Sequence, residues 1–293
     1  MLARVKERVQ FVSSGLKLVG MLQTPDGLRL GERRAAFLVL HGFGSNKDGG
    51  NVVTVADLLT RLGYLTLRFD MRGCGDSQGA RGRTICLEQV EDTRAALEFL
   101  AAQKEVERGG VIGHSFGAAV AVYAAGVDDR LACCISSGGW GDGVKKFRKQ
   151  HESPEAWAKF SAMMETGRQL KARGEQLMVP RYDIVPIRPE LRHNLAPGSI
   201  LEFPFDVVES MYSFRANDVV GRIAPRPLLL LHPAKDTVTP TEQSVDLFAH
   251  AGKPTDLHLI AGVDHFMFAE SNTIVINLLR DWLALHFPAK VNP

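Results

Sequence analysis

The fold is indicated by the stretch Gly113-His114-Ser115-Phe116-Gly117, which fits the pattern G-x-S-x-G. Small residues on both sides of the serine allow the backbone to turn sharply from a strand into a helix, and this turn exposes the serine hydroxyl. The apolar pair Val111-Ile112 precedes the pattern, and a run of small residues suited to a buried helix, 118–125, follows it. Ser115 is therefore predicted to be a nucleophile at the end of a strand.

The same pattern occurs a second time, at Gly75-Asp76-Ser77-Gln78-Gly79. The residues that follow it, Ala80-Arg81-Gly82-Arg83, do not predict a helix that could supply free N–H groups beside the serine. Ser77 is therefore expected to be a hydrogen-bonding loop residue, and Ser115 is preferred as the nucleophile.

A serine nucleophile needs a histidine base and a carboxylate that holds the histidine in the correct tautomer. His265 lies between the last predicted strand and the last predicted helix, at the edge of the sheet where open parallel sheets bind ligands. Asp236 follows the apolar strand 227–231, which gives the chain order Ser115, Asp236, His265. We predict that these three residues are catalytic. Asp142, which also follows a strand, is the second choice for the acid.

Other histidines receive lesser roles. His41 follows a strand and could line the site, and His232 is expected to belong to the loop that carries the acid. His114 is expected to point away from the site, because the turn beside Ser115 is tight.

Extended and helical patterns alternate along most of the chain. Strands are expected at residues 9–12, 16–22, 35–40, 64–69, 111–112, 131–136, 227–231 and 257–260. Helices are expected at 52–62, 87–100, 118–125, 241–249 and 275–283, the last with Ser271 or Asn272 as its cap. This alternation predicts an α/β fold with a mostly parallel central sheet and helices on both faces.

The alternation is lost between residues 139 and 215, a segment that holds nine of the 22 aromatic residues. We predict a cap, 139–215, inserted after the sixth strand of a single catalytic domain formed by 1–138 and 216–293. Such a cap would shape an apolar pocket over the strand ends.

More than half of the aromatic residues of the cap are expected to form its own core. The candidates for substrate binding are Trp140, Trp157, Phe160 and Tyr212. The basic run 145–149 is expected to be a solvated helix face.

Composition excludes several classes of protein. The 293 residues include 35 basic and 33 acidic side chains, a net charge of +2, which argues against a nucleic-acid binder. No apolar stretch is long enough for a membrane span, and the N-terminus lacks a signal-peptide pattern. The four cysteines form no C-x-x-C pair and are expected to be reduced, which favours the cytoplasm. No metal or cofactor is expected, because no metal or phosphate-loop motif occurs.

Taken together, these motifs resemble those of the α/β-hydrolase superfamily, over nearly the whole chain outside the cap. The stretch His41-Gly42-Phe43-Gly44 is similar to the family's oxyanion loop, and Asp70–Ser77 to its D-x-R-G-x-G-x-S signature. The resemblance implies an oxyanion hole formed by the backbone N–H groups of Phe43 and Phe116. Within the superfamily, the chain looks closest to cinnamoyl/feruloyl esterases and to serine-aminopeptidase-like hydrolases.

The expected function is hydrolysis of small to medium carboxylic esters through an acyl-enzyme on Ser115. Cleavage of amides or peptides, or of a C–C bond next to a ketone, stays open because the same residues serve each reaction. A non-catalytic ligand-binding protein is disfavoured by the complete triad. The expected partner is the small-molecule ester, with no nucleic acid and no membrane, and a homodimer is left open.

Overall fold

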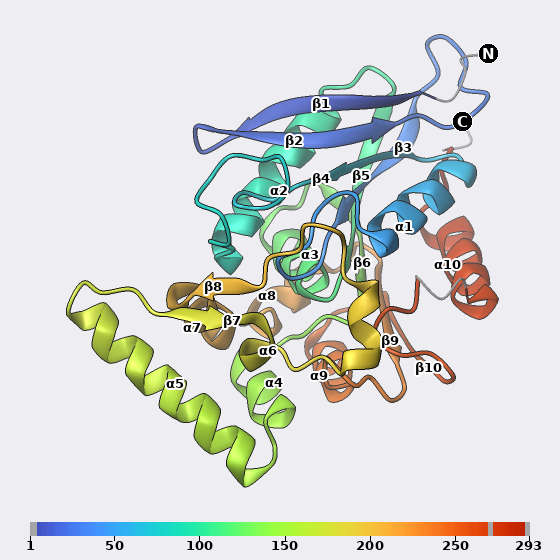
Figure 1. Ribbon diagram of the computed structural model, residues 1–293. Helices are drawn as coiled ribbons and strands as arrows, with labels where there is room; N and C mark the ends of the chain where they lie inside the picture. Colours follow the sequence, from blue (N-terminus) through green and yellow to red (C-terminus); the bar gives the residue numbers. More distant parts are fainter. Residues whose placement is uncertain (1–4, 269–271, 291–293) are drawn as a thin grey trace.

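A computed structural model describes residues 5–268 and 272–290 and shows a central sheet of eight strands in the order β1-β2-β4-β3-β5-β6-β9-β10 (Figure 1). The strands are β1 (Lys6–Ser13), β2 (Leu16–Gln23), β3 (Arg34–Leu40), β4 (Leu65–Phe69), β5 (Val106–His114), β6 (Leu131–Ser137), β9 (Leu228–Pro233) and β10 (Thr255–Ile260). Within this sheet, β3, β4, β5, β6, β9 and β10 pair in parallel, whereas β1–β2 and β2–β4 are antiparallel. The predicted mostly parallel sheet is confirmed.

Helices cover both faces of the sheet, as predicted (Figure 1). One face packs against α1 (Gly50–Arg61) and α10 (Thr273–His286), and the other against α2 (Cys86–Ala101), α3 (Phe116–Val127) and α9 (Glu242–His250). Adjacent residues of a strand serve opposite faces, so Cys133 lies in the α1 and α10 core and Cys134 in the α2 and α3 core. All four cysteines are buried and free, as expected for reduced thiols.

The expected strands and helices outside residues 139–215 are all present, and β5 shows the largest difference in length. It begins at Val106, because Gly109 and Gly110 are part of the strand instead of ending it. A Cβ on Gly109 would lie 2.7 Å from Leu97, and one on Gly110 would lie 2.6 Å from Phe37. These glycines therefore serve close packing on the two faces of the strand.

The predicted cap of α10 is also found. Asn272 Oδ1 accepts hydrogen bonds from the N–H groups of Ile274 (2.9 Å) and Val275 (3.4 Å). The alternative cap, Ser271, lies outside the described residues. No helix within residues 5–268 and 272–290 is long and apolar enough to cross a membrane.

The chain between β6 and β9 forms a group of helices and two short strands beside the sheet, with the long helix α5 outermost (Figure 1). They are α4 (Gly143–Gln150), α5 (Pro154–Ala172), β7 (Met178–Pro180), α6 (Arg181–Ile184), the 3₁₀ helix η1 (Pro189–Asn194), β8 (Glu202–Pro204), α7 (Phe205–Ser213), α8 (Asn217–Val220) and the 3₁₀ helix η2 (Gly221–Ile223). Strands β7 and β8 form a separate two-stranded sheet. The buried side chains of this segment continue the core of the α2 and α3 face.

The expectation that the basic run 145–149 is a solvated helix face is wrong for Lys146. Lys145, Arg148 and Lys149 are exposed, but Lys146 lies on the inner side of α4 and is only 1% exposed. Its Nζ is 3.9 Å from the ring centre of Phe147, and no described residue forms a hydrogen bond with it. Burial lowers the pKa of Lys146 to about 7. The ammonium group thus has no counter-charge to offset its lost hydration.

We expect Lys146→Met to stabilise the fold, because it keeps the apolar stem and removes an unpaired amine. Burying such a polar group costs about 1–3 kcal/mol, so the free energy of unfolding in urea should rise by a comparable amount at pH 7. Lys149→Met is the matched control. Lys149 lies on the same helix as Lys146, but it is exposed and pairs with Glu152. Its loss should change the free energy of unfolding by less than about 0.5 kcal/mol.

The same pair of variants gives a test by pH. The pKa of Lys146 is about 7 when folded against an ordinary 10.5, so the unfolded chain binds one more proton between these values. The free energy of unfolding should therefore rise with pH across this window in the wild type and less steeply in Lys146→Met. Identical slopes would mean that Lys146 is charged and paired.

Candidate active site

A strained turn joins β5 to α3 and carries Ser115 at its apex. Ser115 has φ 56° and ψ −117°, a conformation that residues with a side chain rarely adopt. A Cβ on Gly113 would lie 2.1 Å from the carbonyl oxygen of Gly117, and one on Gly117 would lie 2.5 Å from that of His41. Both flanking glycines are therefore required by the close approach of backbone to backbone, as the sequence pattern predicts.

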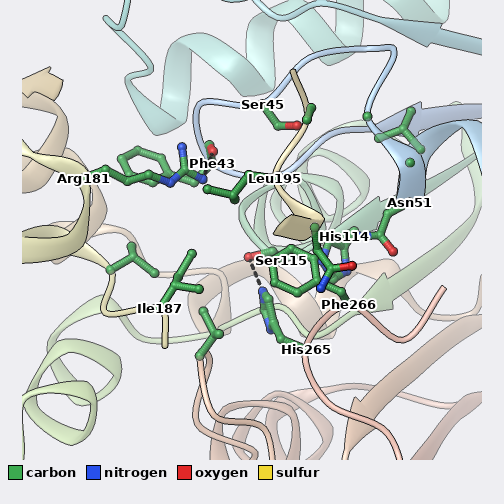
Figure 2. A pocket seen from close by; sticks show the side chains of 18 residues that line it. Phe43, Ser45, Asn51, His114, Ser115, Arg181, Ile187, Leu195, His265 and Phe266 are labelled. Atoms are coloured by element: carbon green, nitrogen blue, oxygen red, sulfur yellow. Dashed lines mark hydrogen bonds between the residues drawn. The ribbon is translucent and has the colours of Figure 1, made fainter. Parts of the chain in front are cut away.

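The structure brings Ser115, His265 and Asp236 together in one hydrogen-bonded chain, and Figure 2 shows the link between Ser115 and His265. His265 Nε2 lies 2.9 Å from Ser115 Oγ, and His265 Nδ1 lies 2.8 Å from Asp236 Oδ2. The three residues come from loops that follow β5, β10 and β9, whose carboxyl ends share one edge of the sheet. With the proton on Nδ1 directed at the carboxylate, Nε2 is free to accept the serine proton.

Asp236 is held as an anion by its surroundings. Its Oδ1 accepts the N–H groups of Val238 (2.7 Å) and Thr239 (2.8 Å), and His232 Nε2 lies 3.4 Å from Oδ2. Burial by itself would raise the pKa of Asp236, but the electrostatic interaction with His265 and the hydrogen bonds from both histidines hold that pKa well below its usual value. His232 thus lies beside the acid, as expected.

The N–H groups of Phe43 and Phe116 lie in the two segments next to the nucleophile. Phe116 is the first residue of α3, so no carbonyl of its own helix can accept its N–H. Phe43 follows β3 in a loop that passes beside the serine: a Cβ on Gly42 would be 3.6 Å from Ser115 Cβ. Across the described residues, neither N–H has a hydrogen-bond partner. Two free donors therefore lie in the segments that flank Ser115, and their role as an oxyanion hole stays a prediction.

The signature segment after β4 holds this loop in place. The carboxylate of Asp70 is fully buried and accepts the N–H groups of Lys47 (2.6 Å) and Asp76 (2.9 Å), while Lys47 Nζ lies 3.0 Å away. Ser77 Oγ donates to the Asp70 carbonyl at 2.6 Å, which confirms Ser77 as a hydrogen-bonding loop residue. His41 is turned away from the cavity, and its Nε2 accepts the N–H of Met71 at 3.1 Å.

Asp142, the second choice for the acid, lies elsewhere. Its carboxylate accepts the N–H of Lys145 at 3.0 Å and thereby caps α4, and it lies 3.2 Å from Arg215. The structure therefore brings Asp236, and not Asp142, to His265.

The prediction that His114 points away from the site is wrong, because its side chain points toward the site. Its ring centre is 4.9 Å from that of His265, and it borders the cavity in front of Ser115. The turn starts only at Ser115, so His114 still follows the alternation of β5 and shares the α1 face with Ile112. Burial and the neighbouring His265 lower the pKa of His114 to about 3.

The cavity in front of Ser115 measures about 520 Å³ with its open mouth. Apolar side chains from the segment after β6 form one wall, namely Val185, Ile187, Leu195 and Ala196. Sequence reasoning missed these residues, because they lie in irregular, proline-rich chain without a periodic pattern. Their contribution to the cavity is decided by how this chain folds over the strand ends.

The aromatic residues predicted to bind substrate do not border this cavity. The ring of Trp140 packs 5.8 Å from Phe116, behind the turn. Trp157, Phe160 and Tyr212 pack together around Phe147. The prediction that these four residues contact substrate is therefore wrong for this cavity. Trp140 and Phe160 are buried in the core, and Trp157 and Tyr212 pack against it partly buried.

Arg181 is a buried cation at the cavity wall. It donates to the carbonyls of Phe43 (2.6 Å) and Ile200 (2.9 Å) and thereby fastens the loop of Phe43 to the segment after β6. Burial lowers the pKa of Arg181 to about 10, so its charge persists at neutral pH. Within the described chain, no aspartate or glutamate borders the cavity.

Known proteins share this architecture. The family described as "Serine aminopeptidase, S33" matches residues 31–272. The polyketide transferase grgF of Penicillium sp. is 26% identical over 90% of this chain and 94% of its own, and the thiohydrolase aneE of Aspergillus aculeatus is 27% identical over 82% and 80%. The structure of Est1E from Butyrivibrio proteoclasticus with ferulic acid bound has a TM-score of 0.68 at 20% identity and covers 95% of this chain and 98% of its own.

We expect Gly113→Ala to disrupt the turn, because its methyl group would overlap the Gly117 carbonyl. Overpacking at a site that cannot relax should lower the free energy of unfolding by about 3 kcal/mol or more, measurable by urea denaturation. Gly15→Ala is the control: Gly15 has φ 78° but no atom within 4 Å, so only backbone strain of about 1–2 kcal/mol applies. Equal losses in the two variants would contradict the packing argument.

Proposed function

The chain belongs to the serine aminopeptidase S33 family of α/β hydrolases, and we propose that it hydrolyses small to medium carboxylic esters through an acyl-enzyme on Ser115. The observation that carries this proposal is the hydrogen-bonded chain from Asp236 through His265 to Ser115. Two free N–H groups beside the serine, from Phe43 and Phe116, complete the requirements for acyl transfer.

The proposed reaction has two halves. His265 Nε2 takes the proton of Ser115 as Oγ attacks the carbonyl carbon, and the N–H groups of Phe43 and Phe116 stabilise the negative oxygen that forms. The tetrahedral intermediate collapses, and His265 gives the proton to the departing alcohol. Water then loses a proton to His265 and attacks the acyl-enzyme, which releases the carboxylic acid and restores Ser115. Asp236 stabilises the imidazolium in each half.

The lining of the cavity favours an ester over a peptide with a free amino terminus. An aminopeptidase must bind the ammonium group of its substrate, and buried charges need an opposite charge nearby. The described wall offers the cation Arg181 and no carboxylate. Apolar residues such as Val185, Ile187 and Leu195 suit an uncharged acyl chain.

Thioesters are a second candidate class. Two relatives that align with more than four fifths of this chain are named as a thiohydrolase and a polyketide transferase. A thioester would form the same acyl-enzyme on Ser115, with a thiol instead of an alcohol as the leaving group. In a transferase, another nucleophile takes the place of water in the second half-reaction.

A fluorophosphonate probe tests the nucleophile. We expect the wild type to be labelled at Ser115, because the probe reacts only with a serine hydroxyl activated by a base. Ser115→Ala should abolish labelling, whereas Ser77→Ala, which changes the other G-x-S-x-G serine, should leave a labelled protein. An unlabelled wild type would favour a ligand-binding protein without catalysis.

A second prediction concerns the acid. Asp236→Asn should lower kcat for nitrophenyl butyrate about 10⁴-fold, because the amide favours the wrong tautomer of His265. Asp142→Asn is the matched control and should keep kcat within about threefold, since Asp142 caps α4 away from the site. A large loss in Asp142→Asn alone would reverse the assignment.

The preferred leaving group is tested with three substrates that carry the same acyl chain: a nitrophenyl ester, a nitroanilide and a thioester. We expect kcat/KM for the nitrophenyl ester to exceed that of the nitroanilide by at least about 100-fold, and the matching thioester shows whether sulfur is preferred. Faster anilide than ester turnover would establish an amidase or peptidase instead.

A further inference from the structure

Two polar side chains lie together in the cavity on the side of Ser115 away from Arg181 (Figure 2). Asn51 is the second residue of α1, and His114 is the last residue of β5. Their exposed fractions are 8% and 7%. Within the described chain, Asn51 Oδ1 and both ring nitrogens of His114 form no hydrogen bond of good geometry, although the Ser137 backbone lies near the His114 ring.

Such atoms are uncommon in folded proteins, where the large majority of buried polar atoms are paired, because an unpaired one costs free energy. Here the two residues that carry these atoms come from two elements and border the same cavity, which opens at Ser115. Both side chains also border a narrower space behind the cavity, whose wall is otherwise apolar, with Val55, Ile112 and Phe268. The described protein offers these atoms no hydrogen bond of good geometry, so a molecule that enters the cavity can supply one.

The charge state and hydrogen-bonding groups of the two side chains indicate which chemical group would bind there. The imidazole of His114 is neutral, because burial keeps its pKa at about 3; it offers one N–H donor and one nitrogen acceptor. Asn51 Oδ1 is an acceptor and needs a donor. An ammonium group would find no carboxylate in the described wall, and a carboxylate would have no proton for Asn51.

A hydroxyl group fits this set, since it donates one hydrogen bond and accepts others. We propose that Asn51 and His114 form a subsite that binds a hydroxyl group on the substrate, so that the preferred substrate is a hydroxyacyl ester. This inference rests on the proposed function for its reaction, but the subsite itself can be tested by binding alone.

The turnover test compares pairs of nitrophenyl esters that differ only in a terminal hydroxyl, with acyl chains of three to eight carbons. We expect the hydroxylated ester to have a kcat/KM at least about 10-fold higher at one chain length, because a site with unpaired polar groups discriminates against the analogue that lacks the hydroxyl. A ratio near one at every length would overturn the subsite.

The variants Asn51→Leu and His114→Phe should each bring that ratio to about one. The matched control is Thr60→Val, which removes a buried hydroxyl at the other end of α1, where Thr60 bonds the Ala56 carbonyl at 2.7 Å. It should preserve the ratio. A preference that survives both Asn51→Leu and His114→Phe would place hydroxyl recognition elsewhere.

Binding to Ser115→Ala separates the subsite from the reaction. Isothermal titration calorimetry with aliphatic amides should show at least about 10-fold tighter binding of the hydroxylated member of each pair, lost when Asn51→Leu is added. If no ester is hydrolysed but this preference is present, the subsite stands and the proposed function falls. If esters are hydrolysed and neither binding nor turnover favours the hydroxyl, the proposed function stands and the subsite falls.

Discussion

The active site depends on the contact of backbone with backbone at the turn around Ser115. Gly117 lies against the carbonyls of Leu40 and His41, and Gly113 against Gly117, with no room for a Cβ at either position. This contact lets α3 begin directly beside the end of β3. The turn therefore brings Ser115 and the free N–H of Phe116 beside the loop of Phe43. The backbone of Ser115 is strained as a result.

Two buried charged residues, Asp70 and Arg181, hold the loop of Phe43 from two sides. Each charge is compensated by hydrogen bonds or by an opposite charge. On one side, buried Asp70 binds both the backbone and the ammonium of Lys47. On the other, Arg181 reaches from the segment after β6 to the Phe43 carbonyl. A movement of that segment would thus also move the loop of Phe43, so the wall of the cavity is coupled to the N–H group that we propose as one oxyanion donor.

The cavity has a different character on its two sides. Apolar residues and Arg181 line one side, and Asn51 with His114 line the other. Family membership indicates a hydrolase, and the fold alone does not choose among ester, thioester and amide. The selectivity that we propose rests on the lining of the described wall, which carries Arg181 and no carboxylate, and on the unpaired atoms of Asn51 and His114.

Short, local constraints could be predicted from the sequence. The glycines around Ser115, the apolar strands, and the order Ser115, Asp236, His265 indicated the fold and the three residues that the structure brings together, because each signal lies within a few residues of the feature it predicts. The cavity wall, the inward side of His114 and the burial of Lys146 were decided only by tertiary structure. These features depend on contacts between distant parts of the chain, such as an irregular segment that packs against the end of a strand. Such contacts leave no periodic pattern in the sequence.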